Sequence, residues 1–244
     1  MTYKSLSADH RRAQLKAPWA PCTSRQERRG VLYYHIKNMD MSKTIKKYAG
    51  IYRKTLAFVK SADADAEIDA YEKRLKEMYE SEEFRKYTVY PTTNVTHVFV
   101  VIAMCLGLKQ YNLSDSQIID AINRGFSVRR NFFKRLLRFI DMLPNAYRIA
   151  EKWNISDHDK RVKDGSLTYE YFKVSEGKVE YSISKCIYIE MFELYGIRSL
   201  CRIFCMTDTT SYENLTKHVV FIRHSDLTEG DCCHDEILDR NRTV

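Results

Sequence analysis

The 244-residue sequence predicts an α+β fold, in which a helical N-terminal part is followed by an antiparallel-sheet unit of order β-β-α-α-β-β. Two observations support this prediction. Apolar residues recur at helical spacing from Ser42 to about residue 155, and two runs of alternating polarity begin after residue 166. The composition agrees, because 44% apolar and 30% charged residues are typical of a globular chain that can bury a large core.

Residues 1–41 are expected to form a poorly structured basic tail. The first 30 residues hold five Arg and two Lys but only two acids, together with Pro18 and Pro21 and no periodicity. An Arg-rich, acid-poor start is also typical of a transit peptide, although the Ser-rich amphipathic character of such peptides is missing here.

Residues 42–155 are expected to form a helical region. The pattern predicts a helix from Ser42, a long charged helix over 63–87 and a helix over 94–110 that is apolar nearly all round. Because its longest apolar run, 98–108, is too short for a membrane span, we interpret it as a core helix. A capping box at Ser114 and Gln117 opens a helix to about residue 142, which Gly125 should kink or divide. A short helix should follow Pro144.

Residues 156–244 are expected to form an α+β region that packs with 42–155 as one unit. Residues 157–165 are interpreted as a polar loop. Residues 167–174 and 179–183 alternate in polarity around a Gly-containing turn and predict a β-hairpin. Helices over 186–194 and 198–215 should follow, and then strands over 217–224 and 232–238.

The net charge of +8 comes from 40 basic and 32 acidic residues that are spread along the whole chain. No basic stripe with interleaved aromatic residues is present, so nucleic acid is not an expected partner. We expect a small-molecule substrate and no membrane association, and a homo-oligomer remains open. The absence of P-loop, GxGxxG and GxSxG motifs argues against kinases, NTPases, Rossmann dehydrogenases and α/β-hydrolases.

Seven cysteines are present, and five of them lie at or after Cys186. The odd count and the lack of a signal-peptide pattern indicate free thiols in a reducing compartment, so we expect a cytoplasmic protein. A thiol-based redox regulator that uses Cys232–Cys233 or Cys201–Cys205 is one alternative function.

The segment that holds Cys201, Cys205 and Asp208 is the first candidate for catalytic chemistry. On a helix these residues share one face, because they are spaced i, i+4 and i+7. A thiol can attack an electrophilic carbon while a carboxyl group one turn away transfers a proton. We therefore select Cys205 and Asp208, and interpret Cys201 as a small core residue.

Two further thiols are candidates. Cys186 begins a predicted helix, where the positive end of the helix dipole lowers a thiol pKa. Cys232 and Cys233 follow the Gly230-Asp231 turn, and neighbouring residues of a strand face opposite sides, so only one of the two can point into the core. His234 should lie on the opposite face from Cys233.

No cofactor is expected, because the sequence has no CxxC, HxxxH or HExxH spacing for zinc. A thiolate-rich zinc site remains an alternative. Its donors would be Cys186, Cys205, Cys233 and one of His218, His224 and His234.

The ordered set of Cys186 at a helix start, Cys205-x-x-Asp208, and Gly230-Asp231 before Cys233 resembles the L-2-amino-thiazoline-4-carboxylic acid hydrolase family. The resemblance extends over about residues 45–240, and its specific motifs lie within 186–233. It implies a hydrolase that opens a C–N bond of a small cyclic amidine-like substrate, with catalytic Cys205, Asp208, Cys186 and Cys233. It also places Gly230 and Asp231 at the substrate.

The chemistry of the substrate adds one more candidate, because a guanidinium can bind a substrate carboxylate through two hydrogen bonds. Arg202 is the selected residue, and Arg198 is the other possibility. As an alternative, the β-β-α-α-β-β unit with clustered thiols also resembles 4-vinyl-reductase-type sensory modules, which bind small ligands or metals.

Overall fold

The computed structural model describes residues 41–59 and 63–242, so the predicted tail, apart from Met41, lies outside the described residues. The predicted order of helices followed by β-β-α-α-β-β is confirmed. All the described residues belong to one compact unit. The helices that precede the sheet are α2 (Met41–Leu56), α3 (Ala64–Glu80), α4 (Glu82–Tyr87), α5 (Thr92–Lys109), α6 (Asp115–Gly125), α7 (Ser127–Ile140) and α8 (Ala146–Asp164).

Helix α5 is the core helix that the sequence predicts. Helices α2, α3, α4, α6 and α9 contact it. Among the described helices it is the one long and apolar enough to cross a membrane, but 67% of it is buried inside the structure. An apolar surface on all sides of a helix is satisfied by neighbours on all sides.

Two predicted helices end or divide at residues with a clear physical role. The single helix expected over 63–87 is wrong, because Ser81 ends α3 and caps α4 by accepting a hydrogen bond from the Phe84 backbone N–H at 3.1 Å. A serine hydroxyl competes well for free N–H groups at a helix start. The predicted capping box at Ser114 and the division after Gly125 are both confirmed.

The predicted loop over 157–165 is wrong, because α8 continues to Asp164. No proline or glycine interrupts residues 146–164, and Arg161 pairs with Asp157 one turn earlier at 3.3 Å, which supports the last turns. The helix ends at Gly165, whose φ of 72° is the left-handed conformation that favours glycine.

The sheet contains β1 (Leu167–Ser175), β2 (Lys178–Cys186), β3 (Val219–Ser225) and β4 (Cys233–Asp239). The order is β1-β2-β4-β3 with antiparallel neighbours, and the predicted hairpin is β1–β2. Helix α9 (Ile187–Glu193), a 3₁₀ turn (Arg198–Cys201) and α10 (Arg202–Tyr212) connect β2 to β3.

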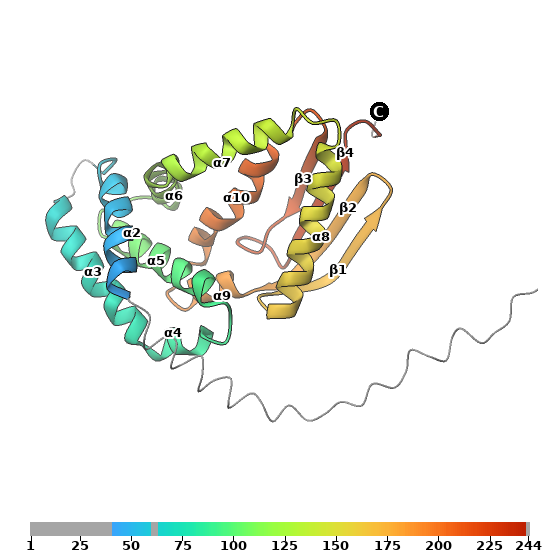
Figure 1. Ribbon diagram of the computed structural model, residues 1–244. Helices are drawn as coiled ribbons and strands as arrows, with labels where there is room; N and C mark the ends of the chain where they lie inside the picture. The colour runs from blue at the N-terminus through green and yellow to red at the C-terminus, as the bar shows by residue number, and fades with distance from the viewer. Residues whose placement is uncertain (1–40, 60–62, 243–244) are drawn as a thin grey trace, which may run out of the picture. The chain divides into compact units, whose positions relative to one another are not determined.

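Helix α8 lies along one face of the sheet and contacts all four strands (Figure 1). We call this helix-covered side the inner face. A cluster of buried side chains joins α7, α8 and the end of α10 to it: Leu137, Tyr147, Ala150, Val179, Tyr212, Leu215, Val219 and Ile237. Since Ile237 points inward, the alternation of β4 also turns Cys233 and Asp235 inward and His234 and Glu236 outward.

Candidate active site

A cavity of about 670 Å³ lies between the inner face of the sheet and helices α5, α7, α8, α9 and α10. Ten of the described residues that line it are Phe, Tyr or Trp. Among the residues that line it, Phe132 and Trp153 remain 74% and 43% exposed, so they mark the side where the cavity opens to solvent. A cavity of this size fits a small molecule.

The structure brings the predicted catalytic residues together. Cys186, Cys205, Cys233 and Asp208 all line this cavity, although β2, α10 and β4 contribute them from distant parts of the chain. Cys201 lines it as well and is almost fully buried. The cavity therefore combines thiols with a carboxyl group in one space.

Cys205 has the environment of a reactive thiol. A hydrogen bond from the Cys201 thiol lowers the pKa of Cys205, burial opposes this effect, and the Arg223 guanidinium lowers the pKa further. The same hydrogen bond raises the pKa of Cys201, because Cys201 keeps the shared proton. The structure thus favours Cys205 as the thiolate of this pair.

The other two cavity thiols have raised pKa values. Burial raises the pKa of Cys186 to about 11, although the backbone N–H groups of Ile189 and Tyr188 act in the opposite direction. The expected activation of Cys186 by the start of α9 is therefore outweighed by desolvation. Burial also raises the pKa of Cys233 to about 12, against the effect of the Leu227 N–H at 3.3 Å from its sulfur.

Arg223 connects the carboxyl groups of the site. Its Nε and one terminal nitrogen donate to the two oxygens of Asp235 at 2.8 and 2.9 Å, which fixes the guanidinium plane. Tyr181 also donates to Asp235 at 3.1 Å. The guanidinium then reaches Asp208 at 3.4 Å and the Cys205 carbonyl oxygen at 3.1 Å. Asp235 therefore holds the cation that contacts the Asp208 carboxyl group and the backbone of Cys205.

The Asp208 side chain is open to the cavity but is otherwise surrounded by protein groups. Its side chain is 55% exposed because it faces the cavity. The surrounding protein still disfavours a charge there, and this desolvation raises the pKa of Asp208 to about 6 in spite of Arg223. A carboxyl group that titrates near neutral pH can both give and take a proton.

Sequence reasoning missed three arginines that line the cavity. Arg223 lies on β3, whose facing direction the strand pattern did not reveal. Arg161 was assigned to a loop, but on α8 it pairs with Asp157 and donates to the Tyr188 hydroxyl at 3.0 Å. Arg130 on α7 donates to the Ile203 carbonyl oxygen at 3.5 Å.

The three arginines differ in how their charge is balanced. Arg161 has Asp157, and Arg223 has Asp235 and Asp208. Within the described part of the chain Arg130 makes no ion pair, and burial lowers its pKa. A guanidinium without an acidic partner in a cavity wall is a place where an anionic group can bind.

Three predicted substrate-binding residues lie outside the cavity lining. The Gly230 N–H donates to the Asp226 carbonyl oxygen at 2.8 Å and closes the turn, while Asp231 is exposed. Arg202 pairs with Glu229 at 2.8 Å and with Asp226 at 3.4 Å. Arg202 therefore joins the segment between β3 and β4 to α10.

Arg198, the other residue considered for a substrate carboxylate, is engaged in the same segment. Its Nε and one terminal nitrogen donate to the Leu227 carbonyl oxygen at 3.1 and 2.8 Å, and it pairs with Glu193 at 3.2 Å.

The mixed Cys/His zinc site is not assembled. His224 and His234 point away from the three cavity thiols, on the outer face of the sheet, as the alternation predicts for His234. His218 precedes β3 and contacts Asn241. The described cysteines, which include both pairs considered for redox regulation, are free thiols.

Comparison with known proteins gives one family. Residues 119–235 match the family model of the L-2-amino-thiazoline-4-carboxylic acid hydrolases. The resemblance noted from the motifs is thereby confirmed for this segment, which contains every cysteine, aspartate and arginine that lines the cavity. Helices α2 to α5 lie outside it. The family name indicates a hydrolase-like function. No curated protein and no solved structure matches the chain.

Proposed function

We propose that the cavity is the active site of a hydrolase that opens a C–N bond of a small, planar, cyclic amidine carrying an anionic group. The observation that carries this proposal is the presence of Cys205 and Asp208 in one cavity, with Arg223 beside both. The family match supports the reaction class, and the aromatic walls suit a flat ring.

In the first step the Cys205 thiolate adds to the amidine carbon, and the C=N π electrons move onto nitrogen. Protonated Asp208 gives its proton to the ring nitrogen. The other amidine nitrogen then gives its electron pair to the carbon and one proton to the ring nitrogen. The C–N bond breaks, the ring nitrogen leaves as a neutral amine, and the carbon keeps its bond to sulfur and a new C=N bond. Asp208 is left as a carboxylate, which Arg223 stabilises at 3.4 Å.

In the second step Asp208 takes a proton from water, and the hydroxyl adds to the same carbon. The C=N π electrons move onto nitrogen, and Asp208 gives this nitrogen the proton that it took from water. The C–S bond then breaks, its electron pair returns to Cys205 as thiolate, and the hydroxyl proton passes to Asp208. Asp208 is protonated again. One water is consumed and one C–N bond is hydrolysed, so no other reactant is required.

The substrate's anionic group is assigned to Arg130, because Arg161 and Arg223 already face carboxylates. We expect Arg130→Gln to raise KM for an anionic substrate by about tenfold or more and to leave kcat nearly unchanged, since the contact is the same in ground and transition states. The matched control is Arg135→Gln, an exposed residue of the same helix.

The covalent step is tested with Cys205→Ala and 2-amino-thiazoline-4-carboxylate as the first substrate. We expect turnover to fall by at least ~10³-fold, while loss of this small side chain costs only about 1 kcal/mol of stability. Cys232→Ala is the control, because Cys232 lies outside the cavity lining. Wild-type turnover in Cys205→Ala would overturn the covalent route.

A further inference from the structure

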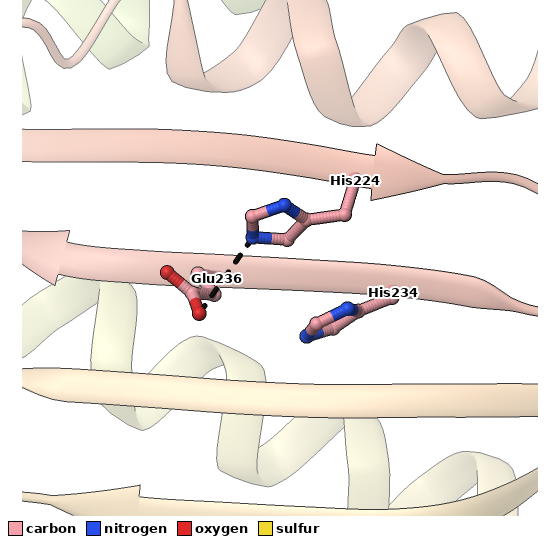
Figure 2. Close-up of side chains that lie close together, drawn as sticks. All are labelled: His224, His234 and Glu236. Carbon is pink, nitrogen blue, oxygen red and sulfur yellow. Dashed lines mark ion pairs between the residues drawn. The ribbon is translucent and has the colours of Figure 1, made fainter.

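A second cluster of chemically competent side chains lies outside the cavity. His224 of β3 and His234 and Glu236 of β4 stand side by side (Figure 2). One possible ligand atom of each residue lies within 4.8 Å of the others. His224 Nε2 is 3.6 Å from Glu236 Oε1, and the two imidazole rings stack with centroids 4.5 Å apart.

The alternation of both strands turns these side chains to the outer face, and a β-bulge lies beside them. Arg223 pairs with Asp235 and Ser225 pairs with His234, so His224 is the extra residue between two consecutive partners. A bulge changes the direction in which a strand presents its side chains. Here Arg223 keeps its contact with Asp235 on the inner face, while the next residue joins the His234 side of β4.

We propose that His224, His234 and Glu236 bind a divalent transition-metal ion of the zinc type. Two imidazoles and one carboxylate are an established zinc donor set, with a fourth position left for water. Zinc–ligand distances of about 2.0–2.2 Å place tetrahedral donors roughly 3.3–3.5 Å apart. The side chains of His224 and His234 are 43% and 29% exposed, so their rings have room to rotate inward by the remaining distance.

The charges around the cluster fit this proposal and also limit the affinity. Glu180 lies next to the cluster, with its Oε1 3.3 Å from His234 Nε2, so two carboxylates face the site. Lys178 pairs with Glu180 at 2.9 Å and with Glu236 at 2.8 Å. One ammonium against two carboxylates leaves a net negative charge, but Lys178 competes with a metal ion for Glu236.

A bound ion would link the bulged end of β3 to β4. The backbone at this link also carries Arg223 and Asp235, which face the cavity on the other side of the sheet. The site is distinct from the cavity and does not depend on the reaction proposed for it.

The proposal is tested by zinc titration of the full chain after chelator treatment, in competition with a chromophoric chelator. We expect the wild type to bind one zinc ion at this cluster, and His234→Ala and Glu236→Gln to weaken that binding by at least about 10–100-fold, the loss that even second-shell partners show. His218→Ala is the matched control and should keep wild-type affinity, because His218 lies outside the cluster.

Lys178→Met gives the sharpest test, because removal of the competing ammonium should tighten zinc binding. Cobalt(II) as a second probe identifies the donors, since a site of nitrogen and oxygen ligands lacks the sulfur-to-metal charge-transfer band that the cavity thiolates would give. Unchanged zinc affinity in His234→Ala and Glu236→Gln, both shown to be folded by circular dichroism, would overturn the proposal. So would weaker binding in Lys178→Met.

Discussion

The helical half and the sheet half of the molecule each contain a buried cluster of charged and phenolic groups. The two clusters differ in the free volume beside them, and this volume decides whether a carboxyl group can react. In the helical half, Glu67 is 5% exposed and accepts from the Tyr52 hydroxyl at 3.0 Å, with Arg74 at 3.4 Å. In the sheet half, Asp235 accepts from Arg223 and Tyr181 in a similar way.

The two clusters differ in what their arginines contact besides the carboxylate of the ion pair. Arg74 donates onward to the Ala103 carbonyl oxygen at 2.9 Å, and a Cβ placed on Gly107 would collide with Glu67 and Tyr52, so no free volume remains. Arg223 instead reaches Asp208, whose side chain faces the cavity. A hydrogen-bonded cluster in a fully packed core stabilises the fold. A similar cluster beside a cavity leaves a carboxyl group that is able to react.

The comparison predicts its largest effect at Asp208. Asp208→Asn removes the proton donor and acceptor, so we expect kcat to fall by ~10²–10⁴-fold, the usual contribution of general acid–base catalysis. Stability should change little, because the side chain faces the cavity. Glu213→Gln, an exposed residue at the end of the same helix, is the control for kcat and for the thermal midpoint. Wild-type kcat in Asp208→Asn would contradict the proposed role of Asp208 as proton donor and acceptor.

The pH profile should show the same carboxyl group. The pKa of Asp208 is raised to about 6, so above this pH the proton donor is lost and kcat should fall by roughly tenfold per pH unit. This alkaline limb should be absent from the residual activity of Asp208→Asn. The free energy of unfolding should also fall as the pH rises through this range. The native state binds the proton more tightly than the unfolded chain, so ionisation between pH 3.8 and about 6 disfavours the native state.

Glu67 is expected to give the opposite outcome to Asp208. Glu67→Gln leaves Arg74 without its anion in a closed core, which should lower the free energy of unfolding by about 1–3 kcal/mol. Activity per folded molecule should be unchanged. The measurement is chemical denaturation, and the control is Glu77→Gln, an exposed glutamate of the same helix. A Glu67→Gln variant with normal stability but reduced kcat would contradict the prediction that the Glu67 cluster serves stability and the cavity cluster serves catalysis.

The smallest effect concerns the order in which thiols react. At neutral pH with limiting iodoacetamide, Cys205 should be alkylated first, because its pKa is lowered, while Cys186 and Cys233 have pKa values of about 11 and 12. Peptide mass mapping gives the order directly. Modification of Cys186 before Cys205 would transfer the role of nucleophile to Cys186.

The sequence predicts the fold where local chemistry decides it. The capping box at Ser114, the break at Gly125 and the hairpin all depend on neighbouring residues, and all three are confirmed. The last turns of α8 were missed because Asp157 and Arg161 look like loop residues until they are placed one turn apart. Arg223 was missed because its role depends on partners from α10 and β4, and such long-range contacts have no local signature.

The alternation of β4 means that one short strand presents different side chains to two environments. Deleting a single residue between Asp226 and Cys232 would shift β4 by one position against its neighbours. Its inward-facing side chains would then point outward, and its outward-facing side chains would point inward. The His234 imidazole would then enter the cavity, while Cys233 and Asp235 would be exposed to solvent. The length of this connecting segment is therefore as strictly fixed as any residue of the candidate site, even though its own side chains line no part of the cavity.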